Sequence, residues 1–141
     1  MIQIISHIIL GISSFTLSLI TVLIGTKNAG RFGESRITKN TFKIHRIFAI
    51  ITGIIVIISF SLGFVLGNGL NITFTFGAGG IHGLTGFIAV ILVLIQIIPS
   101  LIIKRRKQIK LIHRIVGYSL LIDLTIQLIS GILRYTAFYG T

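Results

Sequence analysis

Four long apolar runs, separated by polar segments, constrain the fold of this chain more than any other feature. The runs lie at about residues 4–24, 42–66, 81–103 and 111–135. At about 1.5 Å per residue, an α-helix of about 20 residues crosses the roughly 30 Å hydrocarbon core of a membrane. We therefore expect a single domain spanning residues 1–141, an all-α membrane protein built as an up-down bundle of four transmembrane helices.

The composition supports a membrane protein and excludes several other classes. Hydrophobic residues make up 53% of the sequence, and the mean hydropathy is +1.04. A chain of 141 residues cannot bury that much apolar surface in one soluble core. Cysteine is absent, which excludes disulfides, thiolate metal ligands and covalently attached haem. The first run has no basic segment before it and no small-residue cleavage site after it, so we expect a permanent span rather than a signal peptide.

Positive charges cluster between the apolar runs. Of 13 Lys and Arg residues, all but Arg134 lie in or beside segments 25–43 and 104–110. A net charge of +11 would suggest nucleic acid as the partner of a soluble protein, but this distribution follows the positive-inside rule. We expect both segments in the cytoplasm, both termini outside, contacts with membrane lipid and none with nucleic acid. The uncharged segment 67–80, with a glycosylation sequon at Asn71, is expected as an outer loop, and the membrane as the cytoplasmic membrane of a prokaryote.

Each apolar run opens with one of the four histidines of the chain, followed four residues later by glycine or alanine. The sequence IHRI occurs twice, at 44–47 and 112–115. This order is consistent with the duplication of a two-helix hairpin. The four combinations are His7 with Gly11, His45 with Ala49, His82 with Gly86, and His113 with Gly117.

The histidines are expected at two depths, because consecutive helices of an up-down bundle run in opposite directions. His7 and His82 should lie near the outer surface, and His45 and His113 near the cytoplasmic surface. The first and third helices are diagonal across a four-helix bundle, as are the second and fourth. The sequence therefore predicts two diagonal histidine pairs, one near each face of the membrane.

Steps of +4, +7, +11, +14 and +18 from each histidine trace a stripe of small or polar residues, whereas the other faces are mostly Ile, Leu, Val and Phe. In lipid, we expect the stripes to face inward and the large apolar faces to contact the membrane. Position +14 lies about 21 Å along the helix from its own histidine, level with the opposite pair. The residues expected there are Thr21, Ser59, Gln96 and Gln127.

The histidines indicate more than helix packing, although small residues alone would also suit a bundle that packs only against itself. Ionisable side chains inside a membrane are costly, and four of them paired by depth on inward faces indicate a functional site. Imidazoles from diagonal helices commonly ligate a haem iron from both sides, and a small residue one turn away leaves room for the porphyrin. The sequence thus predicts two haem groups, each with one histidine pair as the axial ligands of its iron and with Gly11, Ala49, Gly86 and Gly117 nearby.

Two segments around these histidines resemble a known family. GIHGLTG at 80–86 is similar to the Ser-Leu-His-Ser-Trp-x-Gly segment of the cytochrome b561 family, and KLIHRIVG at 110–117 is similar to its last core histidine segment. The resemblance implies a four-helix core with one axial histidine per helix, two haem b groups and transmembrane electron transfer. It implies ascorbate as the cytoplasmic donor in eukaryotic members. Leu84 replaces the tryptophan of the motif, eukaryotic members have two further helices, and their basic donor-binding motif has no residue-by-residue match in 25–43.

The function expected is that of a transmembrane oxidoreductase or electron carrier whose donor and acceptor stay open. Ascorbate, quinol or a redox protein would serve as donor, and the ascorbate radical, ferric iron or a protein as acceptor. One alternative is a haem b membrane-anchor subunit that passes quinol electrons to a catalytic subunit. Another is a non-redox transporter or assembly subunit whose histidines bind a metal ion or relay protons, although four histidines at two depths do not easily form one metal site. The sequence leaves open whether the chain forms a homodimer.

Three arginines are candidates for contacts with haem propionates. Arg134 is the one basic residue on the expected outer side, and it lies on an inward stripe, so we expect a propionate contact there. Arg46 and Arg114 directly follow the two cytoplasmic-side histidines. They suit either a propionate contact or an anchor at the membrane surface.

Asp123 is the acidic residue that falls within an apolar run. It lies about 15 Å along its helix from His113, where a charged carboxylate is costly. Three roles fit the sequence: a protonated side chain, a hydrogen bond to a hydroxyl such as that of Thr52 or Ser14, or a contact in a dimer.

Overall fold

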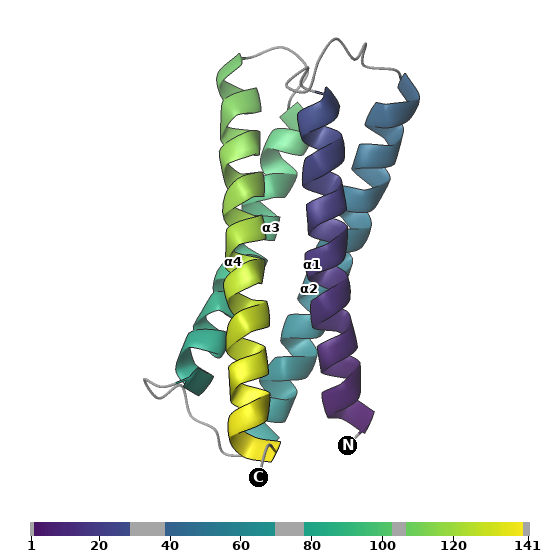
Figure 1. Ribbon diagram of the computed structural model, residues 1–141. Helices are drawn as coiled ribbons and strands as arrows, with labels where there is room; N and C mark the ends of the chain where they lie inside the picture. The colour runs from purple at the N-terminus through teal and green to yellow at the C-terminus, as the bar shows by residue number, and fades with distance from the viewer. Residues whose placement is uncertain (1, 29–38, 70–77, 103–106, 140–141) are drawn as a thin grey trace.

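The structure is a bundle of four antiparallel helices. The computed structural model describes residues 2–28, 39–69, 78–102 and 107–139, and all of them are helical. The helices are α1 (Ile2–Asn28), α2 (Lys39–Gly69), α3 (Ala78–Ile102) and α4 (Lys107–Tyr139). Both termini lie at the same end of the bundle (Figure 1). Each helix contains a segment long and apolar enough to cross a membrane. The chain is therefore an integral membrane protein with the predicted fold, a four-helix transmembrane bundle.

The helices are longer than the sequence predicted. The prediction ended each helix near its last apolar residue, whereas α1 continues to Asn28, α2 begins at Lys39, and α4 begins at Lys107. The predicted loops 25–43, 67–80 and 104–110 were accordingly too long. A formed helix gains one hydrogen bond for each added residue, and polar side chains beyond the hydrocarbon meet headgroups and water, so the apolar boundary does not end the helix. The sequon at Asn71 lies outside the described residues.

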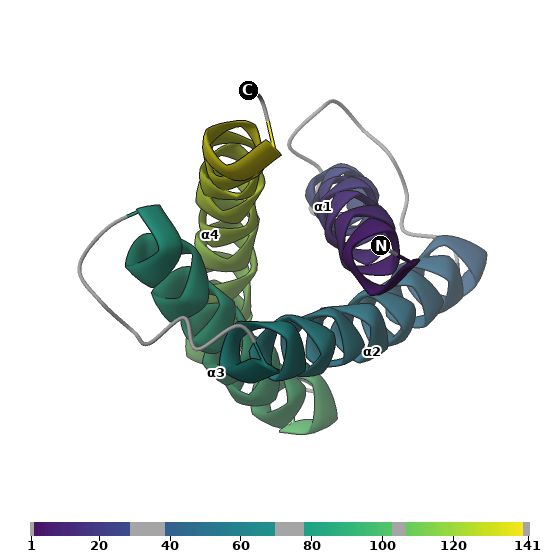
Figure 2. The same cartoon turned by 90° about the horizontal axis from the view of Figure 1, so that it is seen from below.

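The bundle consists of two closely packed hairpins. Within the described residues, α1 packs along α2 and α3 along α4, and narrower contacts join α1 to α4 and α2 to α3. Figure 2, viewed from the end that carries the termini, shows the four helices around a common axis, with α1 and α3 on opposite sides. The first and third helices are thus diagonal, as are the second and fourth, which is the arrangement that the histidine prediction requires.

The interior holds the small and polar side chains, and the surface holds the large apolar ones. Ala89 is completely buried and Ser14 is 2% exposed, whereas Ile54 and Ile122 are 53% and 61% exposed. Hydrocarbon solvates these exposed side chains as well as a protein core would, so a bundle in lipid gains little by burying them. The apolar part of the core consists of Val56, Ala89, Val93, Leu120 and Leu124.

The predicted stripes face inward, as expected. Among the buried side chains of the described residues, all but three lie on the four stripes. The exceptions are Thr85, Asp123 and Ser130. Residues at steps of +4, +7, +11, +14 and +18 lie on one face of a helix, because the helical period is 3.6 residues. When the small and polar residues of that face pack inward, the histidine at its start also faces the interior.

Several buried hydroxyl groups donate to carbonyls of their own helices. Ser14 donates to the carbonyl of Leu10 at 2.8 Å, and Thr52 donates to the carbonyl of Phe48 at 2.8 Å. Such bonds to the carbonyl four residues earlier spare a hydroxyl the cost of an unsatisfied polar group in hydrocarbon. These residues therefore allow close helix packing without needing a polar partner on another helix.

Candidate functional site

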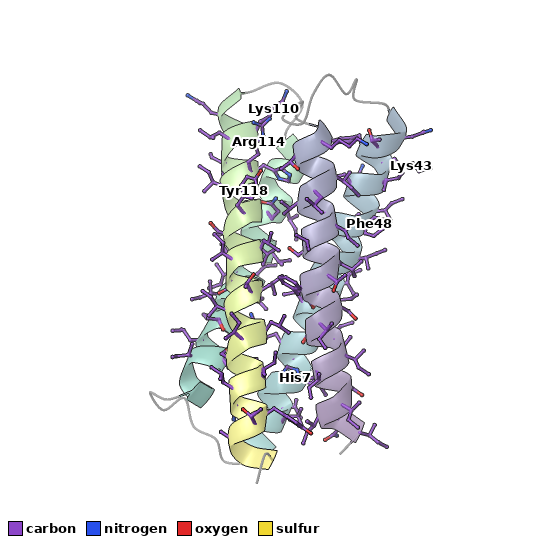
Figure 3. The ribbon with its side chains drawn as sticks, in the orientation of Figure 1. His7, Lys43, Phe48, Lys110, Arg114 and Tyr118 are labelled. Atoms are coloured by element: carbon purple, nitrogen blue, oxygen red, sulfur yellow. The ribbon has the colours of Figure 1, made fainter. Side chains whose placement is uncertain are left out.

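The first histidine pair joins α1 and α3 in the half of the bundle that carries the chain termini. The ring centroids of His7 and His82 lie 5.8 Å apart, and their planes are nearly perpendicular, at 88°. Figure 3 shows His7 in that half of the bundle. We call His7 and His82 the terminal pair. The structure brings together two side chains from diagonal helices that the sequence predicted to face each other.

The second histidine pair joins α2 and α4 in the other half of the bundle. The ring centroids of His45 and His113 lie 6.1 Å apart, with the planes at 76°. Figure 3 shows Lys43 and Lys110 at the same end. We call His45 and His113 the basic-end pair. All four predicted histidines therefore meet in the predicted combinations.

Three of the four imidazoles are oriented by a backbone carbonyl of the neighbouring helix. In each case the ring nitrogen involved is Nδ1. The acceptors are the carbonyls of Ser59 for His7 (3.1 Å), Thr21 for His45 (3.0 Å) and Gln127 for His82 (3.2 Å). A carbonyl can only accept, so Nδ1 carries the proton, and in the neutral ring Nε2 then has the free lone pair. This is the arrangement that orients a histidine for ligation of a metal through Nε2.

The residues at +14 lie where the sequence placed them, level with the opposite histidine pair. Thr21, Ser59 and Gln127 each contact a histidine through the backbone carbonyl, and Gln96 contacts His113 through its side chain. Because 14 residues of helix correspond to about 21 Å, the two histidine pairs are separated by about that distance along the bundle.

His113 is held differently from the other three histidines. The side-chain Nε2 of Gln96 donates to the backbone carbonyl of His113 at 3.1 Å and lies 3.4 Å from the ring Nε2 of His113. Within the described residues, Nδ1 of His113 is buried without a hydrogen-bond partner. The basic-end pair thus contains one imidazole fixed by a carbonyl and one that is not.

Ser130 contacts a histidine of the terminal pair, although the sequence analysis did not identify it. Its Oγ lies 3.2 Å from Nδ1 of His82 and donates to the carbonyl of Gln127 at 3.1 Å. The proton on Nδ1 is therefore shared between a carbonyl and a hydroxyl. Ser130 lies one residue off the stripe of α4, so the spacing gave no sign of this contact.

The small residues at +4 differ in their surroundings. A Cβ atom built on Gly11 would meet nothing within 4 Å. On Gly86 it would lie 3.2 Å from the ring of Phe60, and on Gly117 it would lie 3.4 Å from a side-chain amide of α3. Ala49 is half-buried. Open space beside the histidine, as the haem prediction expects at these positions, is therefore present at Gly11, whereas neighbouring side chains approach Gly86 and Gly117.

The three candidate arginines are placed unequally. Arg134 is half-buried and lies near enough to the terminal pair to interact electrostatically with both of its histidines. Arg114 is half-buried and interacts in the same way with His113. Arg46 is exposed. One half-buried arginine thus accompanies each histidine pair, whereas Arg46 is more exposed than the other two.

Asp123 faces the bundle interior and is bonded within its own helix. Its side chain is 7% exposed, and Gln127 donates to its Oδ2 at a long 3.5 Å. The hydroxyls of Thr52 and Ser14, named as partners from the sequence, instead donate to carbonyls of their own helices. Of the three roles left open for Asp123, a hydrogen bond from one of these hydroxyls is not observed, because a helical threonine or serine donates to the carbonyl one turn back.

The ring separations of the two pairs are compatible with one metal ion held between two imidazoles. Two imidazoles that share one iron have ring centres about 6 Å apart, since each metal–nitrogen bond is about 2 Å and each ring adds about 1 Å. The observed separations of 5.8 and 6.1 Å match this value. Within the described ranges, no group of three or more His, Asp or Glu side chains could hold a metal ion. Each depth therefore offers two imidazole donors, one from each diagonal helix.

Comparisons of this chain with protein families, with curated proteins and with solved structures find no match. The interpretation of the site therefore depends on the placement of the histidines and on the groups that orient them.

Proposed function

We propose that this chain is a transmembrane electron carrier that holds two haem b groups. One would be ligated by the terminal pair, His7 and His82, and the other by the basic-end pair, His45 and His113. The observation that carries the proposal is the presence of two diagonal imidazole pairs at two depths, with ring centres 5.8 and 6.1 Å apart. The resemblance of segments 80–86 and 110–117 to the cytochrome b561 family supports the same function.

Bound haem would supply a one-electron couple at each depth, and the protein would set its environment. If each histidine pair held one haem iron, no position on the iron would be open to oxygen, which would favour electron transfer. The carbonyls of Ser59, Thr21 and Gln127 keep the proton on Nδ1 and increase the basicity of the ligating nitrogen. The large apolar side chains outside the bundle keep water from the interior.

Arginines at the two ends would balance the propionate charges. Arg134 lies beside the terminal pair and Arg114 beside the basic-end pair. A guanidinium pairs with a carboxylate through two parallel hydrogen bonds, and such pairs strengthen away from water. Arg46, which is exposed, is better suited to anchoring α2 at the membrane surface.

The proposal includes an orientation and a set of partners. Following the positive-inside rule, segments 25–43 and 104–110 would face the cytoplasm of a prokaryote, and both termini would face outward. Electrons would enter at one face and leave at the other, with ascorbate, quinol or a redox protein as donor. The basic cytoplasmic face would favour an anionic reductant or anionic lipid.

Single alanine substitutions of the four histidines test the proposal. We expect His7→Ala and His82→Ala to lose one haem, and His45→Ala and His113→Ala to lose the other, so that the four spectra fall into two matching classes. Thr125→Ala is a suitable control, because its hydroxyl is bonded to Leu121 of its own helix. The measurement is the reduced-minus-oxidised spectrum of each purified variant, with haem quantified per chain.

The alternatives predict different results. Four unrelated spectra, or loss of both haems in every histidine variant, would contradict ligation by diagonal pairs. A colourless wild-type protein would favour histidines that bind a metal ion or relay protons. Two haems that are reduced by quinol only in the presence of a co-purifying subunit would favour the membrane-anchor function.

A further inference from the structure

Three glycines that the proposed function does not use lie directly against histidine rings. A Cβ atom built on Gly63 would lie 2.7 Å from Cε1 of His7, and on Gly25 or Gly131 it would lie 3.1 Å from Cε1 of the neighbouring histidine. Those neighbours are His45 for Gly25 and His82 for Gly131. Ordinary contacts of a Cβ atom begin near 3.4 Å. None of the three positions can therefore accept a methyl group unless the imidazole moves.

The glycines follow a common register. Each lies 18 residues after the histidine of its own helix. Each also lies four residues after the residue whose backbone carbonyl accepts from Nδ1 of the histidine on the adjacent helix. In α1 and α2 the relation is reciprocal: the carbonyl of Ser59 and the backbone of Gly63 meet His7. The carbonyl of Thr21 and the backbone of Gly25 meet His45 in the same way. Each ring thus contacts a backbone carbonyl and, one turn further along the same helix, the Cα atom of a glycine. We call these two contacts the ring's seat.

The seat determines the orientation of the ring. An imidazole has two rotatable side-chain bonds, and the atom that faces the glycine is part of the rigid ring rather than the end of a flexible chain. A methyl group at Gly63 would push Cε1 of His7 away and lengthen the bond from Nδ1 to the carbonyl of Ser59, now 3.1 Å. The expected result is a rotated ring whose Nε2 no longer has a fixed direction.

The fourth histidine provides an internal comparison. The residue 18 positions after His82 is Ser100 rather than glycine. On this helix Gln96 meets His113 through its side chain, and Nδ1 of His113 is buried without a hydrogen-bond partner among the described residues. The carbonyl bond to Nδ1 is thus present at the three positions with glycine and absent at the one without it.

We propose that Gly25, Gly63 and Gly131 are positioning residues, each of which keeps the Nδ1 atom of the neighbouring histidine on a backbone carbonyl and leaves Nε2 for ligation. The readout of this inference rests on the proposed function, because haem reports the state of each pair. The inference also distinguishes the pairs: Gly63 and Gly131 serve the terminal pair, whereas Gly25 serves the basic-end pair.

Gly63→Ala, with Gly67→Ala as the matched control, tests the inference in the purified haem-loaded protein. Gly67 lies one turn further along α2, and a Cβ atom there would meet nothing within 4 Å. We expect Gly63→Ala to shift the reduction potential and the low-spin electron paramagnetic resonance signal of the terminal-pair haem, or to lower the haem content from two per chain toward one. The basic-end haem should be unchanged, which also shows that the variant folds. Gly67→Ala should match the wild type.

Gly25→Ala and Gly131→Ala keep the test decisive if Gly63→Ala does not accumulate. Gly25→Ala should alter the basic-end haem alone, and Gly131→Ala the terminal-pair haem alone. Signals identical to wild type in all three variants, or equal changes in both haems, would overturn the inference while leaving the proposed function in place. A wild-type protein without haem would overturn the proposed function itself.

Discussion

Ser130→Ala should raise the reduction potential of the terminal-pair haem and leave the other unchanged. The Oγ atom of Ser130 and the carbonyl of Gln127 each lie 3.2 Å from Nδ1 of His82 and share its proton. Removal of one acceptor makes the imidazole a weaker donor to iron, which destabilises the oxidised state relative to the reduced state. The potential should therefore move upward.

The size of this shift follows from the strength of one shared hydrogen bond. A hydrogen bond contributes about 0.5–1.5 kcal/mol, and for a one-electron couple about 59 mV corresponds to about 1.4 kcal/mol. Because the carbonyl of Gln127 remains as an acceptor, we expect the lower part of this range, about 20–40 mV. Ser130 is buried, and its replacement by alanine removes only one oxygen, so the packing should be preserved.

A spectroelectrochemical titration of the purified protein would measure the shift, with Ser61→Ala as the control. Ser61 is also a helical serine, but it is exposed and its hydroxyl donates to Ile57 of its own helix. The control should titrate as the wild type does. A downward shift in Ser130→Ala, or equal shifts of both haems, would refute the hydrogen-bonding argument.

Two further predictions concern the carboxylate and the orientation of the chain. Asp123→Asn keeps an acceptor for Gln127 and removes the carboxyl group from the bundle interior. The free energy of unfolding in mixed micelles should therefore be unchanged or higher by up to about 3 kcal/mol. A clear loss of stability would show that the carboxyl group has a partner that the asparagine cannot replace. Because the chain has no cysteine, single introduced cysteines can report its orientation in the membrane. Lys110→Cys should react with an impermeant thiol reagent only from the cytoplasmic side, and Ala137→Cys only from outside. The reverse pattern would contradict the proposed orientation.

The fold and the histidine pairing could be predicted because both follow from the helix repeat. Lipid requires each spanning segment to satisfy its own backbone hydrogen bonds, so four apolar runs predict four helices. A rigid helix then fixes which residues share a face and a depth, which is why His7 meets His82 and why Ser59 lies beside His7. The ends of the helices were less predictable, since polar residues such as Lys107 continue a helix beyond the hydrocarbon.

The orientation of each imidazole could not be predicted from spacing. It depends on side-chain rotamers and on helix separations to within an ångström, as the contact between Gly63 and His7 shows. Spacing alone does not indicate that Gln96 contacts His113 through its side chain whereas Gln127 contacts His82 through its backbone carbonyl. Two glutamines at the same +14 step can thus contact a histidine through different groups.

The most direct test of the central claim is the haem content of the wild-type chain, measured as the pyridine haemochrome of detergent-purified protein. We predict two haem b groups per chain, both low-spin, because each of the two histidine pairs, with ring centres 5.8 and 6.1 Å apart, would ligate one iron. A preparation that binds no haem, even when folded and supplied with it, would contradict the account.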